Sequence, residues 1–381
     1  MRSTLARMCG QLVLLAMVAA VGCGGPPAGG AKSDTGGGPA GGSAAGGSKR
    51  IMFVTNGDDP FWDAVLSGLN EGARQFGAEA AGLKVQRDVN NGTAEGQIEK
   101  LRQYATQDDI AGVAISVIQA DNLAIIEEMR NLQKKGIKVI TVDGDVNRAE
   151  FRDARSYYIG TDNIVGGRTL GTATKALLEA KGVKEGGYVQ YAGFTDNDNA
   201  RSRMNGVQET IGSAYTQLDR MPDNMDLAKA RDNVRNAIQN HKNMVAHVGI
   251  WVYNAPAIAD VVKETGTREK YVVATFDAQD LAIAAMEQGL IDVMVVQNPF
   301  DMGLQTVRLM KAMVTGDEAT VKEMFPRQGQ ADGDIYTTGL RVVVPKESSA
   351  VKRELFDAKV VEYMLLPDFK AWLAKYGLHS S

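Results

Sequence analysis

Short apolar runs alternate with longer segments in which apolar positions recur every three or four residues. Residues 51–55 (IMFVT) show the first pattern, which is typical of a strand buried on both faces. Residues 61–76 show the second pattern, with Val65, Leu69 and Phe76 on one predicted helix face. Apolar strands separated by amphipathic helices indicate parallel βαβ units.

This alternation occurs in two successive runs. The first run predicts strands at 51–55, 83–88, 112–117 and 137–143, with helices at 61–76, 93–107 and 122–135 between them. The second run predicts helices at 165–181, 201–211, 227–240 and 257–265, and strands at 187–192, 215–221, 248–253, 271–277 and 291–296. The predicted fold class is therefore α/β, with two doubly wound parallel-sheet lobes.

Polar side chains gather where several predicted strands end. In doubly wound sheets, ligands bind outside the carboxyl ends of the strands, so these residues are candidates for a binding site. The candidates at or near such ends are Asp59, Phe61, Trp62, Asp143, Asn254, Asp277 and Gln297, together with Arg201 and Arg203 at the start of a helix.

Carboxylates, amides, a guanidinium and aromatic rings together suit a neutral polyol. Carboxylates and amides pair with hydroxyl groups, arginine donates through a planar fork, and an aromatic ring covers the apolar face of a sugar. Each residue also has a structural alternative: aspartate or asparagine after a strand often forms a turn or caps a helix. Phe61 and Trp62 could be core residues, and Arg203 could be a surface cation.

Composition narrows the function classes. The 381 residues are 44% apolar and 23% charged, which suits two folded domains. A formal net charge of −4 argues against a nucleic-acid-binding surface, which usually carries a basic excess. Cys9 and Cys23 are the two cysteines, so neither a disulfide framework nor a cysteine nucleophile is expected in the folded body. The three histidines lack metal-ligand spacing, and neither metal nor cofactor is expected.

The start of the chain has the pattern of an export signal. Two arginines precede an apolar run at 12–21, which is too short to span a bilayer and suits a secretory signal. The sequence Ala-Val-Gly-Cys, ending at Cys23, resembles the lipobox of bacterial lipoproteins. We therefore predict a signal peptide at 1–22, lipidation of Cys23 and a flexible Gly/Ala/Pro/Ser tether at 23–48. The alternative is an ordinary signal peptide that is cut nearby.

Several segments, in their order and spacing, resemble the type I periplasmic binding proteins of ABC transporters, the ribose-binding-like sugar group. They include "NGDDPFWDAVLSGLNEGARQFG", "IKVITVDGD", "ARSRMNGV", "ATFDAQDLAIAAMEQG" and "VVQNPFDMG". The resemblance covers about residues 50–345. It implies two lobes joined by a three-segment hinge, which close around a ligand without performing chemistry on it.

The resemblance also implies a set of sugar contacts. Residues of matching type are Phe61, Trp62, Asp143, Arg203, Asn254, Asp277 and Gln297. Three positions depart from the ribose pattern, because Asp59 stands where asparagine is usual and Gly144 stands where an arginine follows the aspartate. Met225 stands where an aromatic residue often covers the second sugar face, although Trp251 or Tyr253 could compensate. A pentose, a hexose or a related polyol is therefore expected rather than ribose specifically.

The same resemblance implies where each lobe begins and ends. The chain is expected to cross between the lobes near 160–162, 297–298 and 337–338. The first lobe is then expected to comprise 49–161 and 298–337, and the second 162–297 and 338–346. Residues 347–381 form an extension whose part 367–377 predicts a short amphipathic helix with Phe369 and Trp372 near one face. We expect this helix to pack on the body, the alternative being a permease-docking element.

The expected function is capture of a monosaccharide and its delivery to an ABC permease. The protein is expected to be a monomer in the periplasm or cell envelope, attached to the membrane by its lipid. The same module could instead serve a chemoreceptor or sensor kinase, or bind a non-sugar molecule. A repressor of the lactose-repressor family would need a helix-turn-helix where the export signal stands. A glycosidase would use Asp143 and Asp277 as acid and base, but sugar hydrogen bonding accounts better for both.

Overall fold

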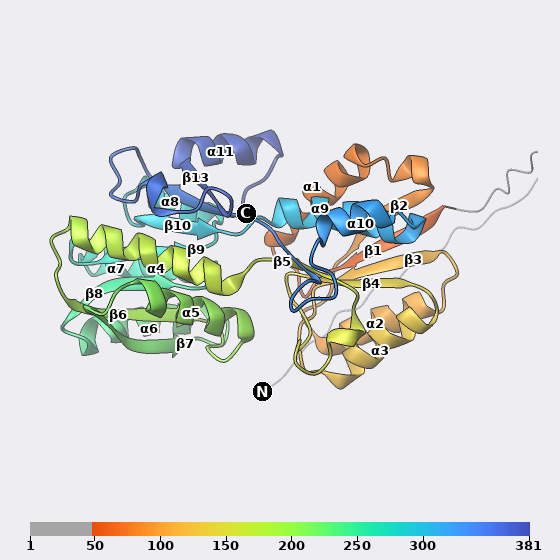
Figure 1. The fold of residues 1–381 in the computed structure, drawn as a ribbon. Coiled ribbons are helices and arrows are strands. Elements are labelled where there is room, and N and C mark those ends of the chain that lie inside the picture. Colours follow the sequence, from red (N-terminus) through yellow and green to blue (C-terminus); the bar gives the residue numbers. More distant parts are fainter. Residues whose placement is uncertain (1–47) are drawn as a thin grey trace, which may run out of the picture. The chain divides into compact units, whose positions relative to one another are not determined.

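The computed structural model describes residues 48–381, which contain two sheets with helices on both faces of each (Figure 1). The predicted signal peptide, Cys23 and all of the predicted tether except Ser48 lie outside the described residues. Among residues 48–381, no helix is long and apolar enough to cross a membrane.

Lobe 1 is built on a six-stranded sheet in the order β11-β5-β4-β3-β1-β2, with all neighbours parallel. Its strands are β1 (Lys49–Val54), β2 (Leu83–Asp88), β3 (Ile110–Ile115), β4 (Lys138–Val142), β5 (Tyr158–Gly160) and β11 (Ile335–Thr337). Its helices are α1 (Phe61–Gln75), α2 (Ala94–Ala105), α3 (Leu123–Lys134), α9 (Pro299–Thr315) and α10 (Glu318–Met324).

Lobe 2 is built on a seven-stranded sheet in the order β13-β12-β10-β9-β8-β6-β7, parallel except between β10 and β12. Its strands are β6 (Gly186–Ala192), β7 (Tyr215–Pro222), β8 (Met244–Gly249), β9 (Val272–Phe276), β10 (Val293–Val296), β12 (Leu340–Val344) and β13 (Val361–Leu365). Its helices are α4 (Asn163–Ala180), α5 (Asp198–Thr210), α6 (Leu227–Asn240), α7 (Asn254–Glu264), α8 (Asp280–Glu287) and α11 (Leu366–Lys375).

Successive residues of each central strand enter different apolar cores. In β1, Phe53 belongs to the core beneath α1 and α9, whereas Val54 belongs to the core beneath α2 and α3. In β6, Tyr188 faces the core beneath α4 and α5, and Val189 faces the core that includes residues of α6 and α7. Burial of both faces explains why these strands are continuous apolar runs in the sequence.

The chain passes between the two lobes three times. The connecting residues are 161–162 between β5 and α4, 297–298 between β10 and α9, and 338–339 between β11 and β12. Hydrogen bonds link these segments to one another. Thr161 Oγ1 donates to Gln297 Oε1 at 2.8 Å, and the main-chain N–H of Thr338 donates to the carbonyl oxygen of Gly160 at 2.8 Å. The three connections therefore lie side by side.

The predicted class of two parallel α/β lobes is confirmed, but one predicted strand is wrong. The strand expected at 248–253 ends at Gly249, which is its last residue paired with β9. The following residues form a turn because Asn254 Oδ1 accepts a hydrogen bond from the Trp251 N–H at 3.0 Å and α7 begins at Asn254. Apolar composition extended the predicted strand through this turn.

Candidate functional site

The two lobes present equivalent strand ends. Lobe 1 contains the order β2-β1-β3-β4-β5 and lobe 2 the order β7-β6-β8-β9-β10, so β4 and β9 occupy the same place. Each is followed by an aspartate with a left-handed backbone, Asp143 with φ 62° and Asp277 with φ 60°. This conformation costs a non-glycine residue about 1–2 kcal/mol, and such outliers cluster at functional sites.

Asp277 is the centre of a buried polar network in lobe 2. Gln297 donates to its carboxylate twice, from the main-chain N–H at 3.1 Å and from Nε2 at 2.9 Å. Arg203 Nη1 lies 3.7 Å from Asp277 Oδ2. All three side chains are at least 95% buried. Burial raises the pKa of Asp277, while the positive charge of Arg203 and the bonds from Gln297 act in the opposite direction.

Arg203 is held by groups on three sides. Its Nε donates to Asn163 Oδ1 at 2.9 Å and its Nη1 to the Ile250 carbonyl at 3.2 Å. The guanidinium lies 4.0 Å above the ring centroid of Phe276. Helix α5 approaches α4 closely, because a Cβ at Gly167 would lie only 2.1 Å from the Arg203 carbonyl oxygen. Arg203 is thus a fixed buried cation, not a surface residue.

Asp143 presents the carboxylate of lobe 1. Its Oδ2 lies 3.5 Å from Ser116 Oγ, and its carbonyl accepts from the Tyr158 hydroxyl at 3.1 Å. Burial raises the pKa of Asp143 to about 6, opposed by the positive charge of Arg203 and reinforced by the negative charge of Asp277. The charges of Arg203 and Asp277, which lie in lobe 2, therefore act on Asp143 in lobe 1.

The mouth of lobe 1 contains Asp59, Phe61 and Trp62, which have different environments. Asp59 Oδ1 accepts from the Phe61 N–H at 2.8 Å, so this carboxylate forms the turn that starts α1. Burial raises its pKa, and its charge in turn raises that of Asp277. Phe61 is partly exposed and packs edge-on against Trp62, with ring centroids 5.0 Å apart. Trp62 is only 3% exposed and belongs to the lobe 1 core with Phe53.

In lobe 2, Met225 and Asn254 lie in the segments that follow β7 and β8. Asn254 is buried, and its Nδ2 donates to Asp223 Oδ2 at 2.9 Å while its Oδ1 accepts from Trp251. Met225 is 62% exposed and has φ 62°. Its main-chain N–H donates to Asp223 Oδ1 at 2.9 Å. Asn254 is therefore satisfied by its own lobe, whereas the Met225 side chain is open to solvent.

The structure adds residues to the site that sequence reasoning did not select. Asp223 is fully buried and also accepts from the Tyr253 hydroxyl at 2.6 Å, so it fixes both Tyr253 and Asn254. Thr161 fixes the amide of Gln297. The position of Asp223, directly after β7, is the same signal that selected Asp143 and Asp277.

The arrangement is suited to binding. Arg203, Asp277 and Gln297 are in direct contact, and the charges of Asp59 and Asp143 act on the same network. Three carboxyl groups and one guanidinium give a site with an excess of negative charge, which disfavours anionic ligands. Within residues 48–381, no group of three or more His, Cys, Asp or Glu side chains is placed to hold a metal ion.

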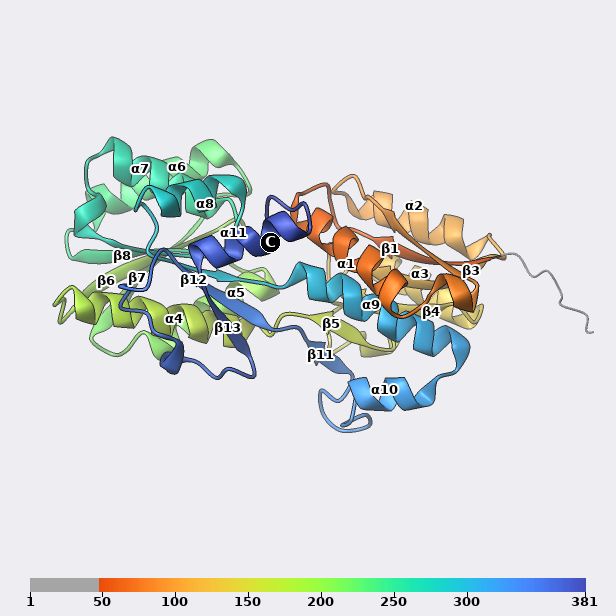
Figure 2. The same ribbon diagram turned by 90° about the horizontal axis from the view of Figure 1, so that it is seen from above.

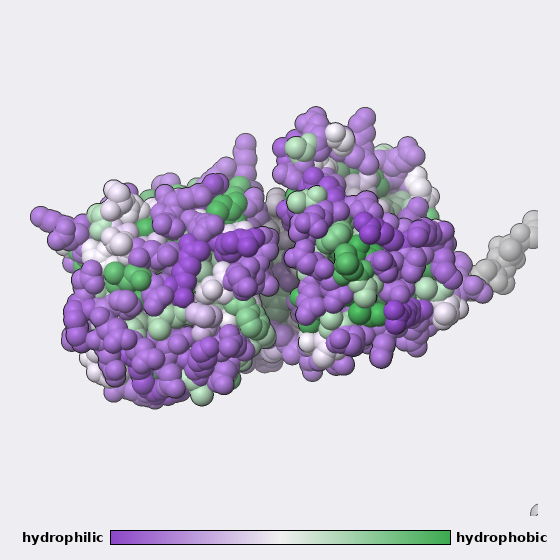
Figure 3. Space-filling model, turned by 90° about the horizontal axis from the view of Figure 1, so that it is seen from below, coloured by the Kyte–Doolittle hydropathy of each residue, from purple (hydrophilic) through white to green (hydrophobic). Residues whose placement is uncertain are grey.

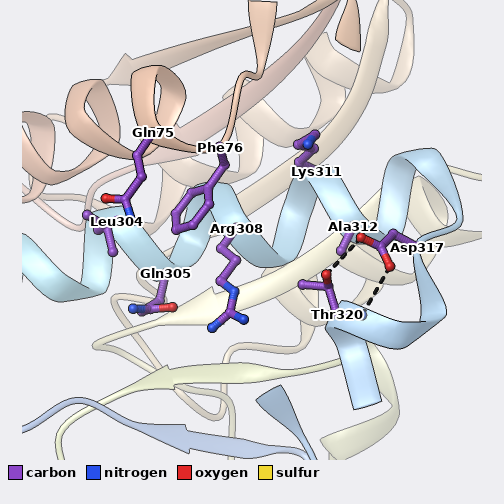
Figure 4. A pocket seen from close by; sticks show the side chains of 9 residues that line it. All are labelled: Gln75, Phe76, Leu304, Gln305, Arg308, Lys311, Ala312, Asp317 and Thr320. Carbon is purple, nitrogen blue, oxygen red and sulfur yellow. Dashed lines mark hydrogen bonds between the residues drawn. The ribbon is translucent and has the colours of Figure 1, made fainter. Parts of the chain in front are cut away.

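A separate cavity of about 470 Å³ lies on the helical side of lobe 1, between the end of α1 and helices α9 and α10 (Figure 4). Its polar groups have local roles. Arg308 Nη2 pairs with Glu323 at 2.6 Å, and Asp317 caps α10 by accepting from Thr320. None of the residues that line this cavity belongs to the group around Asp143 and Asp277.

The chain matches known proteins over most of its length. Residues 51–318 match the family described as periplasmic binding protein domain. The D-allose-binding periplasmic protein of Escherichia coli (strain K12) is 23% identical over 260 residues, which are 66% of this chain and 80% of that protein.

Solved structures share the fold. The ABC transporter solute-binding protein from Burkholderia graminis C4D1M, in complex with D-arabinose, gives a TM-score of 0.65 at 22% identity and covers 81% of this chain and 99% of that chain. GanP, a glucose-galactose binding protein from Geobacillus stearothermophilus, gives a TM-score of 0.65 at 19% identity, covering 79% and 99%.

Proposed function

The chain belongs to the periplasmic binding protein family, and from this premise we propose that it captures a neutral monosaccharide between its lobes. The observation that carries the proposal is the buried Arg203–Asp277–Gln297 network, with Asp143 at the equivalent strand end of the other lobe. Carboxylates accept hydrogen bonds from sugar hydroxyls, and the guanidinium donates to hydroxyl or ring oxygens.

Binding is proposed to draw the lobes together around the three connections. A sugar that contacts Asp143 on lobe 1 and Asp277 on lobe 2 gains both sets of hydrogen bonds only when the lobes are closed. Such a difference in contacts shifts the equilibrium towards the closed form. No step of bond making or breaking is assigned, and the carboxylates act as hydrogen-bond acceptors rather than as an acid and base pair.

The ligand class is proposed from chemistry and from relatives. The names of similar proteins include D-allose, D-arabinose and glucose or galactose as ligands. An aldopentose or aldohexose carries enough vicinal hydroxyls for the acceptors present. Phe61 is proposed to cover one apolar face, with Trp62 contributing at most an edge because it is almost fully buried. Met225, Asn254 and Asp59 remain proposed contacts.

The sugar is proposed to be handed to an ABC permease that recognises the closed lobes. Family membership indicates a location outside the cytoplasm. The proposal adds a membrane anchor through lipidated Cys23 after removal of residues 1–22, and a monomeric state.

A thermal-shift panel tests the proposal. Neutral aldopentoses and aldohexoses are expected to raise the melting temperature, because a ligand at 100 times its Kd adds about 2.7 kcal/mol of stability. The corresponding sugar phosphates and uronic acids serve as matched controls. They are expected to give no shift, since their negative charge would face Asp59, Asp143 and Asp277. A shift with the acids and none with the neutral sugars would refute the assigned site.

The affinity is expected to depend on pH through Asp143. Its pKa of about 6 means that the carboxyl group of the free protein is protonated below that pH, whereas the bound sugar requires the ionised acceptor. Affinity should therefore fall about tenfold between pH 7 and pH 5. Titration calorimetry at both pH values measures this, and Asp143→Asn should bind weakly with little pH dependence. An unchanged wild-type affinity across this range would contradict the role of Asp143.

A further inference from the structure

The segment 366–381, which we call the strap, begins as part of lobe 2. Strand β13 pairs in parallel with β12 from Leu340↔Val361 to Val344↔Leu365, and α11 follows directly. Leu366, Phe369 and Leu373 of α11 are buried in a lobe 2 core. Helix α11 is therefore fixed to lobe 2.

The same helix also contacts lobe 1. The rings of Trp372 and Tyr376 lie 5.8 Å and 4.3 Å, centroid to centroid, from Phe300 of α9. Fully buried Ala64 of α1 belongs to the same apolar cluster as α11. Figure 2 shows α11 extending from the sheet of lobe 2 towards α1 and α9. The strap thus forms a fourth, non-covalent connection between the lobes.

Phe300 is a firm point of attachment on lobe 1. It lies two residues after Asn298 of the second chain crossing, so its contact with α11 spans the hinge. Helices α1 and α9 approach closely there, because a Cβ at Gly68 would lie 1.9 Å from the Phe300 carbonyl oxygen. A movement of lobe 1 relative to lobe 2 would therefore change the contact between Phe300 and the strap.

The strap then turns back to the ligand site. Gly377, with φ 64°, allows the turn after α11. The main-chain N–H of Ser381 donates to the Ala278 carbonyl at 2.9 Å, and the Ala278 N–H donates to a main-chain oxygen of Ser381 at 3.1 Å. Ser381 Oγ lies 3.5 Å from the Gln297 carbonyl oxygen. Ser381 is only 2% exposed, and it touches the residues next to Asp277 and at the second crossing.

Arg341 of β12 joins the two ends of the strap. Its guanidinium lies 4.0 Å above the Trp372 ring, and its Nη1 lies 3.5 Å from Ser381 Oγ. The side chain is buried and pairs with Glu362 at 3.1 Å. The aromatic contact with lobe 1 and the main-chain contact with the ligand site are therefore mechanically linked.

We propose that the strap is a positioning element for the ligand site, with Ser381 holding Asp277 and Gln297 in their binding geometry. Asp277 has an unfavourable left-handed backbone, and such a conformation persists only where neighbouring contacts enforce it. The paired hydrogen bonds at Ala278 supply this enforcement one residue away. The inference rests on the proposed sugar-binding function.

Deletion of residues 379–381 tests the proposal. It removes both main-chain bonds to Ala278 but keeps α11 and buried Leu378. The rate of hydrogen exchange at the Ala278 amide, which the hydrogen bond to Ser381 protects, should rise at least tenfold. The Kd for D-allose or D-arabinose should rise about tenfold, because the binding carboxylate loses its fixed geometry. His379→Ala is the matched control, since this side chain is 83% exposed, and it should change neither quantity.

A double-mutant cycle separates positioning from a general structural effect. In an Asp277→Asn background, the deletion should change Kd less than twofold, because the carboxylate that the strap positions is gone. Trp372→Ala removes the aromatic contact between the strap and Phe300 but keeps residues 379–381. It should weaken binding severalfold. An unchanged Kd after deletion, or an equal loss with and without the Asp277 carboxylate, overturns the proposal. If the wild-type protein binds neither sugar, the proposed function fails, and amide exchange at Ala278 alone decides whether the strap holds the site.

Discussion

Asp277→Asn is expected to weaken monosaccharide binding about a hundredfold or more. Asp277 is 5% exposed, faces Arg203 and accepts two hydrogen bonds from Gln297, so the isosteric amide removes a buried charge from the centre of the network. Truncating one partner of a buried, hydrogen-bonded charge pair typically costs about 2–5 kcal/mol in binding. Titration calorimetry of both proteins with the sugar giving the largest thermal shift measures the loss.

The variant should remain folded with reduced stability. Arg203 loses its anionic partner while buried, which costs about 3 kcal/mol. Circular dichroism at the temperature of the binding experiment shows that the folded population is unchanged. Asp280→Asn, three residues along the chain and with a 70% exposed side chain, is the matched control and should bind as the wild type does. Equal affinity of Asp277→Asn and wild type would show that Asp277 does not contact the ligand.

The second large effect is a decrease in the free energy of unfolding below pH 6.5, and it arises from His247. This side chain of β8 is fully buried, its Nδ1 lies 2.7 Å from the Tyr191 hydroxyl, and its Nε2 has no partner among the described residues. Burial, together with the positive charge of Arg268, lowers its pKa from 6.5 to about 3. Between these values the unfolded chain binds a proton that the folded protein excludes, so stability falls as pH falls.

The full contribution of this proton is about 5 kcal/mol, which is the shift of the pKa multiplied by the free energy of one pKa unit. His247→Gln keeps an acceptor for Tyr191 but cannot titrate. Urea unfolding from pH 7 to pH 4 should therefore show the wild type losing its stability advantage over the variant as pH falls. Comparison of the two proteins cancels the opposite contribution of Asp143, whose raised pKa favours the folded state on acidification.

His379→Gln is the control for this series because its side chain lies at the surface. Its unfolding profile should follow that of the wild type at every pH. Parallel profiles for wild type and His247→Gln would mean that His247 does not exclude a proton in the folded protein.

Much of the fold could be predicted because burial on both faces leaves a direct mark on the sequence. The central strands of both lobes, such as β1, β3 and β9, are largely apolar runs, and the helices between them have one apolar face. The strand predicted through Trp251 failed because an asparagine turn, not hydrophobicity, decides where β8 ends. Residues 361–365, which add β13 to lobe 2, pair only with β12, and such long-range pairing leaves no local pattern.

The candidate site could likewise be predicted only in part. Asp143 and Asp277 could be found because each follows a buried strand, and Arg203 could be found from the resemblance. The direction in which each side chain points could not be predicted from the sequence. Trp62 is adjacent to Phe61 yet enters the core, and Asn254 bonds to Asp223, because side-chain direction depends on packing between elements far apart in the chain. The contact of Ser381 with Ala278 spans about a hundred residues and has no sequence signature.

Exposed apolar side chains provide useful positions on both lobes. On the face in Figure 3, hydrophilic residues predominate and apolar residues form small separate patches on the two lobes. Single exposed apolar side chains at the starts of helices, such as Leu123 and Leu227, are each about 60% exposed. These positions are useful because they mark the carboxyl-end side of each sheet.

The distance between the lobes, measured with and without sugar, tests the central claim most directly. Both cysteines precede residue 48, so Leu123→Cys and Leu227→Cys place one spin label on each lobe of a body that otherwise lacks cysteine. Both residues begin helices that follow strand carboxyl ends, and pulsed electron resonance reports the distance between them. A monosaccharide at about ten times the wild-type Kd should shorten this distance in the wild-type background and leave it nearly unchanged in Asp277→Asn, whose Kd is expected to be about a hundredfold higher. A sugar that binds without altering the distance would contradict capture between the lobes.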